Sequence, residues 1–252
     1  MRTTLAILTA VLAVGVVRAA DDDAAKAKAV VEKAVKAAGW EKNGANVSKT
    51  WNDKGALHVG GEKLEYTGEW WFSGPDKYRF EVKVKIAGMD ITVTSVTNAD
   101  KSWQLAADQL ETVAGDKLEY TRDQVYFQWV YTLTPLLTEK AFTLKPIDGV
   151  KVNGNETTGV EVTHKDRPTV KLYFDAKTGL LSKAETKVKN ELDDWKEATD
   201  ELVISEWKEG ADKKKHPTKS TLTRGGTLFV ESEQSGHKFV DKVDEKLFAE
   251  LK

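Results

Sequence analysis

The sequence contains no cysteine and only four histidines among its 252 residues. The absence of cysteine excludes disulfide bonds, thiolate metal sites and lipid attachment to a cysteine. No two of the histidines, His58, His164, His216 and His237, have the spacing of metal ligands. We therefore expect no metal site and no other cofactor.

Motifs of the common enzyme classes are also missing. There is no Gly-x-Ser-x-Gly sequence, and the glycine pairs at 60–61 and 225–226 do not stand between a strand and a helix, as a phosphate-binding loop would. The adjacent carboxylates Asp193 and Asp194 lie in a charged segment, residues 191–197, and are better explained as a solvated loop. We expect a protein that is not an enzyme, although folding could still assemble a catalytic cluster from distant residues.

Long hydrophobic runs are absent except near the N-terminus. There, Arg2 precedes an apolar run over residues 5–17, which is shorter than the roughly 20 residues that span a membrane. Small residues at Ala19 and Ala20 and three aspartates follow it. We predict a secretory signal peptide over residues 1–19 and a periplasmic location. Cleavage would remove Arg2 and Arg18 and leave 36 basic against 40 acidic residues, a balance that argues against nucleic acid as a partner.

The segment from residue 24 to 39 is rich in alanine and lysine, with valines at helical spacing. We predict a helix here, with an N-cap among the aspartates at 21–23 and a stop at Gly39. Its alanine-rich face indicates close packing against a sheet.

Alternation of apolar and polar residues then predicts a series of antiparallel hairpins with one face in water. In one of these strands Tyr78, Phe80, Val82 and Val84 alternate with charged residues. The expected strands are 64–72, 78–86, 90–96, 102–105, 141–145, 159–164, 169–174, 180–188, 201–207 and 220–232.

The period changes over residues 121–137, where apolar side chains recur at helical spacing and Pro135 interrupts the pattern. A short closing helix is expected at 244–249. No internal repeat or linker divides the chain, so residues 20–252 are expected to form a single domain.

Four short motifs occur in a fixed order along the chain. They are GEWWFSGP at 68–75, NADKSW at 98–103, TPLL at 134–137 and FDAKTGL at 174–180. Together with an N-terminal helix followed by strands, a helix and further strands, they resemble the LolA-like family of periplasmic carriers of outer-membrane lipoproteins. The resemblance spans most of the chain after the N-terminal segment.

The resemblance implies a fold that is mainly β with helices (α+β). This fold is an incomplete antiparallel β-barrel, a strongly curved sheet with helices capping its concave apolar face. It also implies a monomeric periplasmic carrier or chaperone that binds the acyl chains of lipoproteins or lipids for transfer toward the outer membrane. Membrane-bound donor and acceptor proteins would then be its partners.

An alternative on the same fold is a regulatory module that senses envelope stress by binding a protein partner, through a surface around Trp71 or Trp207. One family feature is absent here. The arginine that latches the lid in the family corresponds to Gly74. A closed state would therefore be held by another contact, or not held at all.

The expected acyl-binding residues come from the predicted strands and from the helix at 125–137, which is the candidate lid or, alternatively, a permanently packed core helix. They are Trp70, Phe72, Tyr78, Phe80, Val82, Val84, Ile91, Val93, Val125, Trp129, Leu133 and Leu136.

Overall fold

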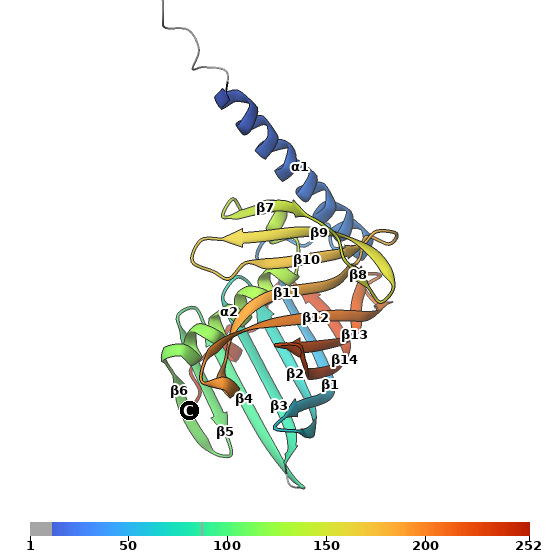
Figure 1. Cartoon of the computed structure of the whole chain (residues 1–252). Coiled ribbons are helices and arrows are strands. Elements are labelled where there is room, and N and C mark those ends of the chain that lie inside the picture. The colour runs from blue at the N-terminus through green and yellow to red at the C-terminus, as the bar shows by residue number, and fades with distance from the viewer. Residues whose placement is uncertain (1–11, 87) are drawn as a thin grey trace, which may run out of the picture.

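The computed structural model describes residues 12–86 and 88–252, which share one large antiparallel sheet (Figure 1). The strands are β1 (Ser48–Val59), β2 (Glu62–Ser73), β3 (Lys77–Ile86), β4 (Met89–Asn98), β5 (Lys101–Ala106), β6 (Gln109–Val113), β7 (Phe142–Ile147), β8 (Lys151–Val152), β9 (Asn155–His164), β10 (Val170–Asp175), β11 (Leu181–Asn190), β12 (Lys196–Glu209), β13 (Lys215–Arg224) and β14 (Thr227–Val240). The helices are α1 (Leu12–Ala38), α2 (Gly115–Tyr131), α3 (Pro135–Thr138) and the two 3₁₀ turns η1 (Glu191–Asp193) and η2 (Glu245–Phe248).

The sheet has 14 strands and is open. Its order is β6-β5-β4-β3-β2-β1-β14-β13-β12-β11-β10-β9-β7, and β8 pairs with β9 beside this path. The edge strands β6 and β7 are not paired with each other in the described part of the chain. Figure 1 shows the strands at the two ends of the sheet crossing at a steep angle, as the twist of a long sheet requires. The predicted class, a strongly curved antiparallel sheet with helices, is confirmed.

The register of the central strands puts aromatic side chains in rows across the concave face. Trp51 on β1 pairs with Trp70 on β2, and Trp70 pairs with Phe80 on β3. In the next row Phe72 pairs with Tyr78. Residues directly opposite on neighbouring antiparallel strands lie on the same face of the sheet, so these rings contact one another.

Helix α1 packs against β7 and β9 with small side chains: Ala27, Val31, Ala34 and Val35 are all buried. It ends as predicted, because Gly39 adopts a positive φ of 74° that halts the helix. The N-cap predicted at residues 21–23 is wrong, since the helix continues upstream to Leu12. The predicted signal-peptide cleavage is not tested by the structure, and residues 1–11 lie outside the described part of the chain.

Helix α2 starts earlier than predicted, at Gly115, and ends at Tyr131. The interruption expected near Pro135 is confirmed: Leu133 takes a positive φ of 64°, and Pro135 opens the short helix α3. No helix in the described part of the chain is both long and apolar enough to cross a membrane.

Three predictions of strands and helices need correction. Strands β1, β6 and β8 were not predicted at all. The single strand predicted over 220–232 is wrong, because Gly225 and Gly226 form a positive-φ turn that separates β13 from β14. The closing helix at 244–249 is only the 3₁₀ turn η2, whose Phe248 packs in a separate small cluster with Val96 and Trp103.

Candidate functional site

The concave face of the sheet is the candidate site, and its two halves differ in chemistry. On β2, β3 and β4 its side chains are aromatic and aliphatic. On β1 and β11–β14 they are mixed and include Lys49, Asp200, His216 and His237. The two halves meet along β1, where Trp51 stacks on Trp70 with ring centroids 6.1 Å apart.

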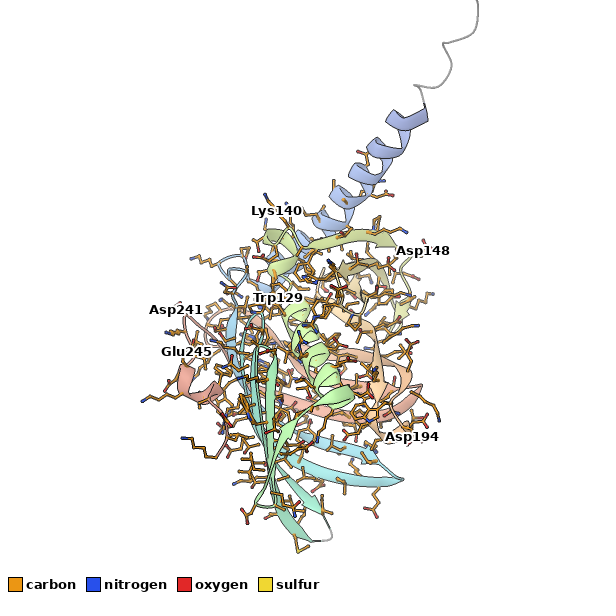
Figure 2. The ribbon with its side chains drawn as sticks, turned by 90° about the vertical axis from the view of Figure 1, so that its left-hand side faces the viewer. Trp129, Lys140, Asp148, Asp194, Asp241 and Glu245 are labelled. Carbon is orange, nitrogen blue, oxygen red and sulfur yellow. The ribbon has the colours of Figure 1, made fainter. Side chains whose placement is uncertain are left out.

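Helix α2 lies in front of this face (Figure 2). One side of its second half is buried in the main core. Val125 and Val130 are almost inaccessible, and the Trp129 ring lies 4.8 Å from that of Phe142. The indole Nε1 of Trp129 also donates a hydrogen bond to the carbonyl of Ala45 at 3.0 Å. This side anchors the helix.

The first half of α2, before Val125, has no fully buried residue and is attached by polar contacts. Arg224 on β13 binds the Asp200 carboxylate through two hydrogen bonds of 2.7 and 2.8 Å and donates a third, of 3.0 Å, to the Tyr120 hydroxyl. Asp123 accepts a hydrogen bond from Arg167 at 3.1 Å. The Lys189 ammonium donates to Glu119 at 3.1 Å, and also to Asp116.

Gly74, at the position of the family's latch arginine, touches α2 directly. A Cβ atom there would lie 2.9 Å from Cδ1 of Trp129, so a larger side chain would displace the helix. In this chain the arginine that contacts α2 from the sheet is Arg224.

A cavity of about 140 Å³ lies between the other side of α2 and the polar half of the sheet. Phe127, Gln128 and Tyr131 line it from α2, while Trp51 and Phe239 line it from the sheet. Lys49 on β1 also lines it. The Lys49 ammonium lies 4.6 Å from the centre of the Trp51 ring and 5.1 Å from that of Tyr131.

Burial dominates the electrostatics of this region. Burial lowers the pKa of the Lys49 ammonium to about 7. The pKa of His237 is lowered to about 3, mainly by burial and to a smaller degree by the nearby His216 and Lys49. Farther along β1, burial raises the pKa of Asp53 to about 6, although Ser232 donates a hydrogen bond to its carboxylate. Each shift reflects the cost of placing a charge in a poorly solvated site.

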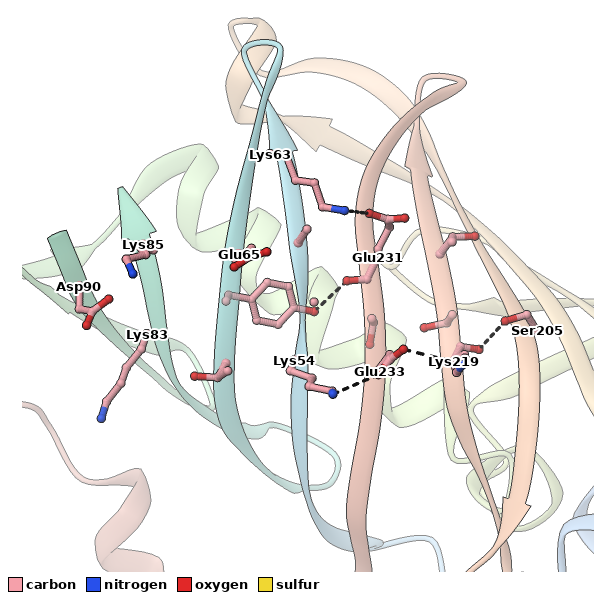
Figure 3. A pocket seen from close by; sticks show the side chains of 17 residues that line it. Lys54, Lys63, Glu65, Lys83, Lys85, Asp90, Ser205, Lys219, Glu231 and Glu233 are labelled. Carbon is pink, nitrogen blue, oxygen red and sulfur yellow. Dashed lines mark hydrogen bonds and ion pairs between the residues drawn. The ribbon is translucent and has the colours of Figure 1, made fainter. Parts of the chain in front are cut away.

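A larger depression of about 680 Å³ lies on the face of the sheet turned away from α2 (Figure 3). Its lining is charged and largely paired: Lys54 lies 3.3 Å from Glu233, and Lys63 lies 3.0 Å from Glu231. These side chains are about half exposed or more, apart from Glu231, which is slightly less so. A solvated ion-pair surface of this kind offers nothing to an apolar ligand.

The sequence-predicted binding residues occupy three places. Phe72, Val125, Trp129, Leu133 and Leu136 are buried in the main core, with Trp70 and Tyr78 packed against it. Val82 and Val84 form a second cluster on the concave face, with Phe80 beside them. Ile91 and Val93 on β4 pair with Val84 and Val82, and both are half-buried.

None of these twelve residues lines the cavity under α2, whose walls come mainly from β1 and β11–β14. Sequence reasoning therefore missed the whole lining of this cavity, including its cation Lys49. The sequence did contain one signal for Lys49. The turn glycines at 60–61 indicate a strand on each side, and the strand before them is β1, which carries Lys49.

The surfaces expected for the regulatory alternative are partly covered. Trp71 packs against the cluster around Phe248 and lies 5.7 Å from the guanidinium of Arg79. Trp207 contacts Trp40, and its Nε1 donates to the carbonyl of Leu181 at 3.0 Å. Neither tryptophan forms a free apolar patch.

Comparison with known structures identifies the fold. A DUF1329 family protein from Desulfovibrio piger is 13% identical, with a TM-score of 0.57 over 88% of this chain and 97% of that protein. A LolA superfamily protein from Nitrosomonas europaea is 12% identical, with a TM-score of 0.57 over 89% and 97%. A putative outer membrane lipoprotein-sorting protein domain from Vibrio parahaemolyticus is 11% identical, with a TM-score of 0.56 over 89% and 97%.

No family model and no curated protein sequence matches the chain. The structural similarity shows the class: this protein has the LolA-like half-barrel fold, as its motifs indicate. At this level of identity the similarity defines the fold alone.

Proposed function

We propose that the protein is a periplasmic, non-catalytic carrier that binds the acyl chains of lipoproteins or lipids in its concavity and passes them toward the outer membrane. Membrane-bound donor and acceptor proteins would load and unload it. The supporting observation is that Trp70, Tyr78 and Phe80 stay only half-buried on the concave face, next to a cavity beneath α2. The signal-peptide pattern of residues 1–19 supports export.

The energetics favour a carrier whose lid moves. Burying an acyl chain of about 14 methylenes would contribute roughly 11 kcal/mol, at about 0.8 kcal/mol each. The closed cavity of about 140 Å³ is close in size to one that holds a benzene molecule, so a whole chain needs α2 to be displaced. Breaking the contacts of α2 would offset part of the gain and keep binding reversible.

The test is the uptake of a fluorescent acyl probe by delipidated protein. We expect saturable binding that palmitate competes away. Phe80→Asp should weaken binding at least about tenfold, because it places a carboxylate among the half-buried rings. Lys83→Asp puts the same group on the outer face of the same strand and serves as the matched control.

Failure of the delipidated protein to take up any acyl probe would refute the carrier. The regulatory module would then be the better hypothesis. Recovery of a membrane-protein partner from envelope extract would test it.

A further inference from the structure

The cavity beneath α2 contains a cation without a counter-ion. The Lys49 ammonium donates a hydrogen bond of 3.4 Å to Oε1 of Gln128. The rings of Trp51, Tyr131 and Phe72 surround it at 4.6, 5.1 and 5.9 Å. In the described part of the chain, no carboxylate lies within 4.0 Å of it.

The acidic residue and the two histidines of the cavity are already engaged. Asp200, the only acidic residue in the lining, accepts two hydrogen bonds from Arg224. His216 bonds to Asp212 through its Nε2, and the Nε2 of His237 bonds to the carbonyl of Pro217. Lys49 is therefore the lining group whose charge the protein does not balance.

A buried ammonium without an anion costs stability, and aromatic rings with one amide oxygen compensate for only part of that cost. A lysine in such a position is explained if a ligand supplies the missing negative charge. The cavity also offers the side-chain amides of Gln124 and Gln128 to the same ligand. The site thus has the elements of an anion receptor.

The size and charge of the cavity indicate which class of anion would fit it. One unbalanced cation matches a single negative charge better than the charge of about −1.5 to −2 on a phosphate monoester. A volume of about 140 Å³ accommodates a compact head and the first few carbons, not a glycerophosphate group with two chains. A carboxylate meets both conditions.

An apolar path leaves the cavity from the same place. Trp51 lines the cavity and stacks on Trp70 at 6.1 Å, and Trp70 lies 6.5 Å from Phe80. This row crosses three strands of the concave face. A chain attached to a head group at Lys49 could follow it toward the half-buried residues of β3.

We propose that the cavity under α2 binds the carboxylate of a long-chain fatty acid, with Lys49 as its counter-ion and the Trp51–Trp70–Phe80 row as the wall for its chain. This inference rests on the proposed function and specifies its cargo as a single-chain anionic lipid. Neutral acyl groups, such as those of a triacylated lipoprotein, would lack the charge that Lys49 pairs with.

The test compares cis-parinaric acid, a fluorescent fatty acid, with its methyl ester on delipidated full-length chain at pH 6.5. The two ligands share one chain and differ in the charged head. The wild type should bind the acid about ten- to a hundredfold more tightly than the ester, the range expected for a charged hydrogen bond. In Lys49→Met the ratio should fall to about one.

The control is Lys54→Met, which removes a lysine from the outer face of the same strand, where its side chain is 68% exposed. It should keep the wild-type ratio. Thermal unfolding of both variants checks that they fold, and Lys49→Met should be at least as stable as the wild type because it removes an unpaired buried charge.

The remaining outcomes separate the two proposals. If neither ligand binds, the carrier function and the fatty-acid site both fail. If acid and ester bind the wild type equally, the carrier stands and the fatty-acid site is refuted. Tighter binding of lysophosphatidate than of the fatty acid would also overturn the carboxylate assignment and favour a phosphate head.

Discussion

Helices α1 and α2 both pack against the sheet, but different kinds of side chain attach them. The buried side of α1 consists of alanine and valine. Among its described side chains, from residue 22 on, the polar contact with the rest of the fold is the hydrogen bond from Lys33 to the carbonyl of Ala176. The first half of α2 depends on Tyr120, Asp123 and Glu119, each bound to a basic residue of the sheet or its loops. Water can replace contacts of the second kind at a small net cost, but not those of the first. The comparison indicates that α1 is a fixed wall, whereas the first half of α2 is the part able to detach from the sheet.

The largest loss of stability is expected for a substitution in α1. Val31→Asp buries a carboxylate on the inaccessible side of the helix and should lower the free energy of unfolding by at least about 4 kcal/mol. Urea unfolding at pH 7 measures this. Ala29→Asp, on the exposed side of the same helix, should cost less than about 1 kcal/mol, which is its helix-propensity penalty. Equal effects of the two changes would show that α1 is not a fixed wall.

A smaller loss is expected at the anchor of α2. Trp129→Ala removes the ring that packs on Phe142 and beside Gly74, and should cost about 3 kcal/mol. Gln124→Ala, on the cavity side, should change stability by less than about 0.5 kcal/mol. If Trp129→Ala costs less than about 1 kcal/mol, polar contacts alone hold α2. The buried second half of the helix would then not be its anchor.

The same contrast explains what sequence could and could not predict. The second half of α1 with its end at Gly39 and the strands β2–β4 have patterns that match their burial, so they were predictable, whereas the start of α1 was not. Strand β1 was missed because its inward positions include Lys49, Asp53 and Gly55, which break the apolar alternation. Pairing with β2 and β14 on both sides fixes this strand, and a single sequence does not contain that information.

The cavity beneath α2 was missed for the same reason. Predicted binding residues were chosen because they are apolar, and several of them are simply buried, as Phe72 and Leu133 are. The cavity instead lies where polar residues from distant strands meet: Lys49 and His216 are far apart in sequence, yet both line it. The glycine turn at 60–61 was the one local signal of a preceding strand.

The next prediction concerns pH and the charge beneath α2. The pKa of Lys49 is about 7 in the folded chain and 10.5 in the reference state, so between these values the unfolded chain binds more protons. Stability should therefore rise as pH increases from about 7 to 10.5, by at most about 1.4 kcal/mol per pH unit. The measurement is urea unfolding of the wild type and Lys49→Met at pH 6, 7, 8 and 9, with the difference between them taken at each pH.

The groups that face Lys49 do not mask this trend. Burial lowers the pKa of His237 to about 3, so this residue is neutral throughout the window, and burial also lowers the pKa of His216. Asp200 is held by Arg224, and α2 presents only neutral side chains to the cavity. A difference between wild type and Lys49→Met that does not change with pH would show that the ammonium is solvated, and would place α2 farther from the sheet in solution.

The substitution with the smallest expected loss of stability tests whether α2 opens independently of α1. Tyr120→Phe removes the hydroxyl that accepts a hydrogen bond from Arg224 but keeps the ring beside the guanidinium. We expect a loss of about 0.5–1.5 kcal/mol. Because the first half of α2 has little buried surface, this loss should appear as local opening. Amide hydrogen exchange should accelerate in α2, by up to about tenfold, and stay unchanged in α1.

The matched control lies six residues farther along the same helix. Tyr126→Phe removes a buried hydroxyl that has no hydrogen-bond partner in the described part of the chain, so it should leave exchange in α2 unchanged or slow it slightly. If Tyr120→Phe instead accelerates exchange in α1 and α2 to the same degree, the two helices open together. The polar contacts of α2 would then stabilise the whole fold, and the contrast between a fixed helix and a detachable one would be lost.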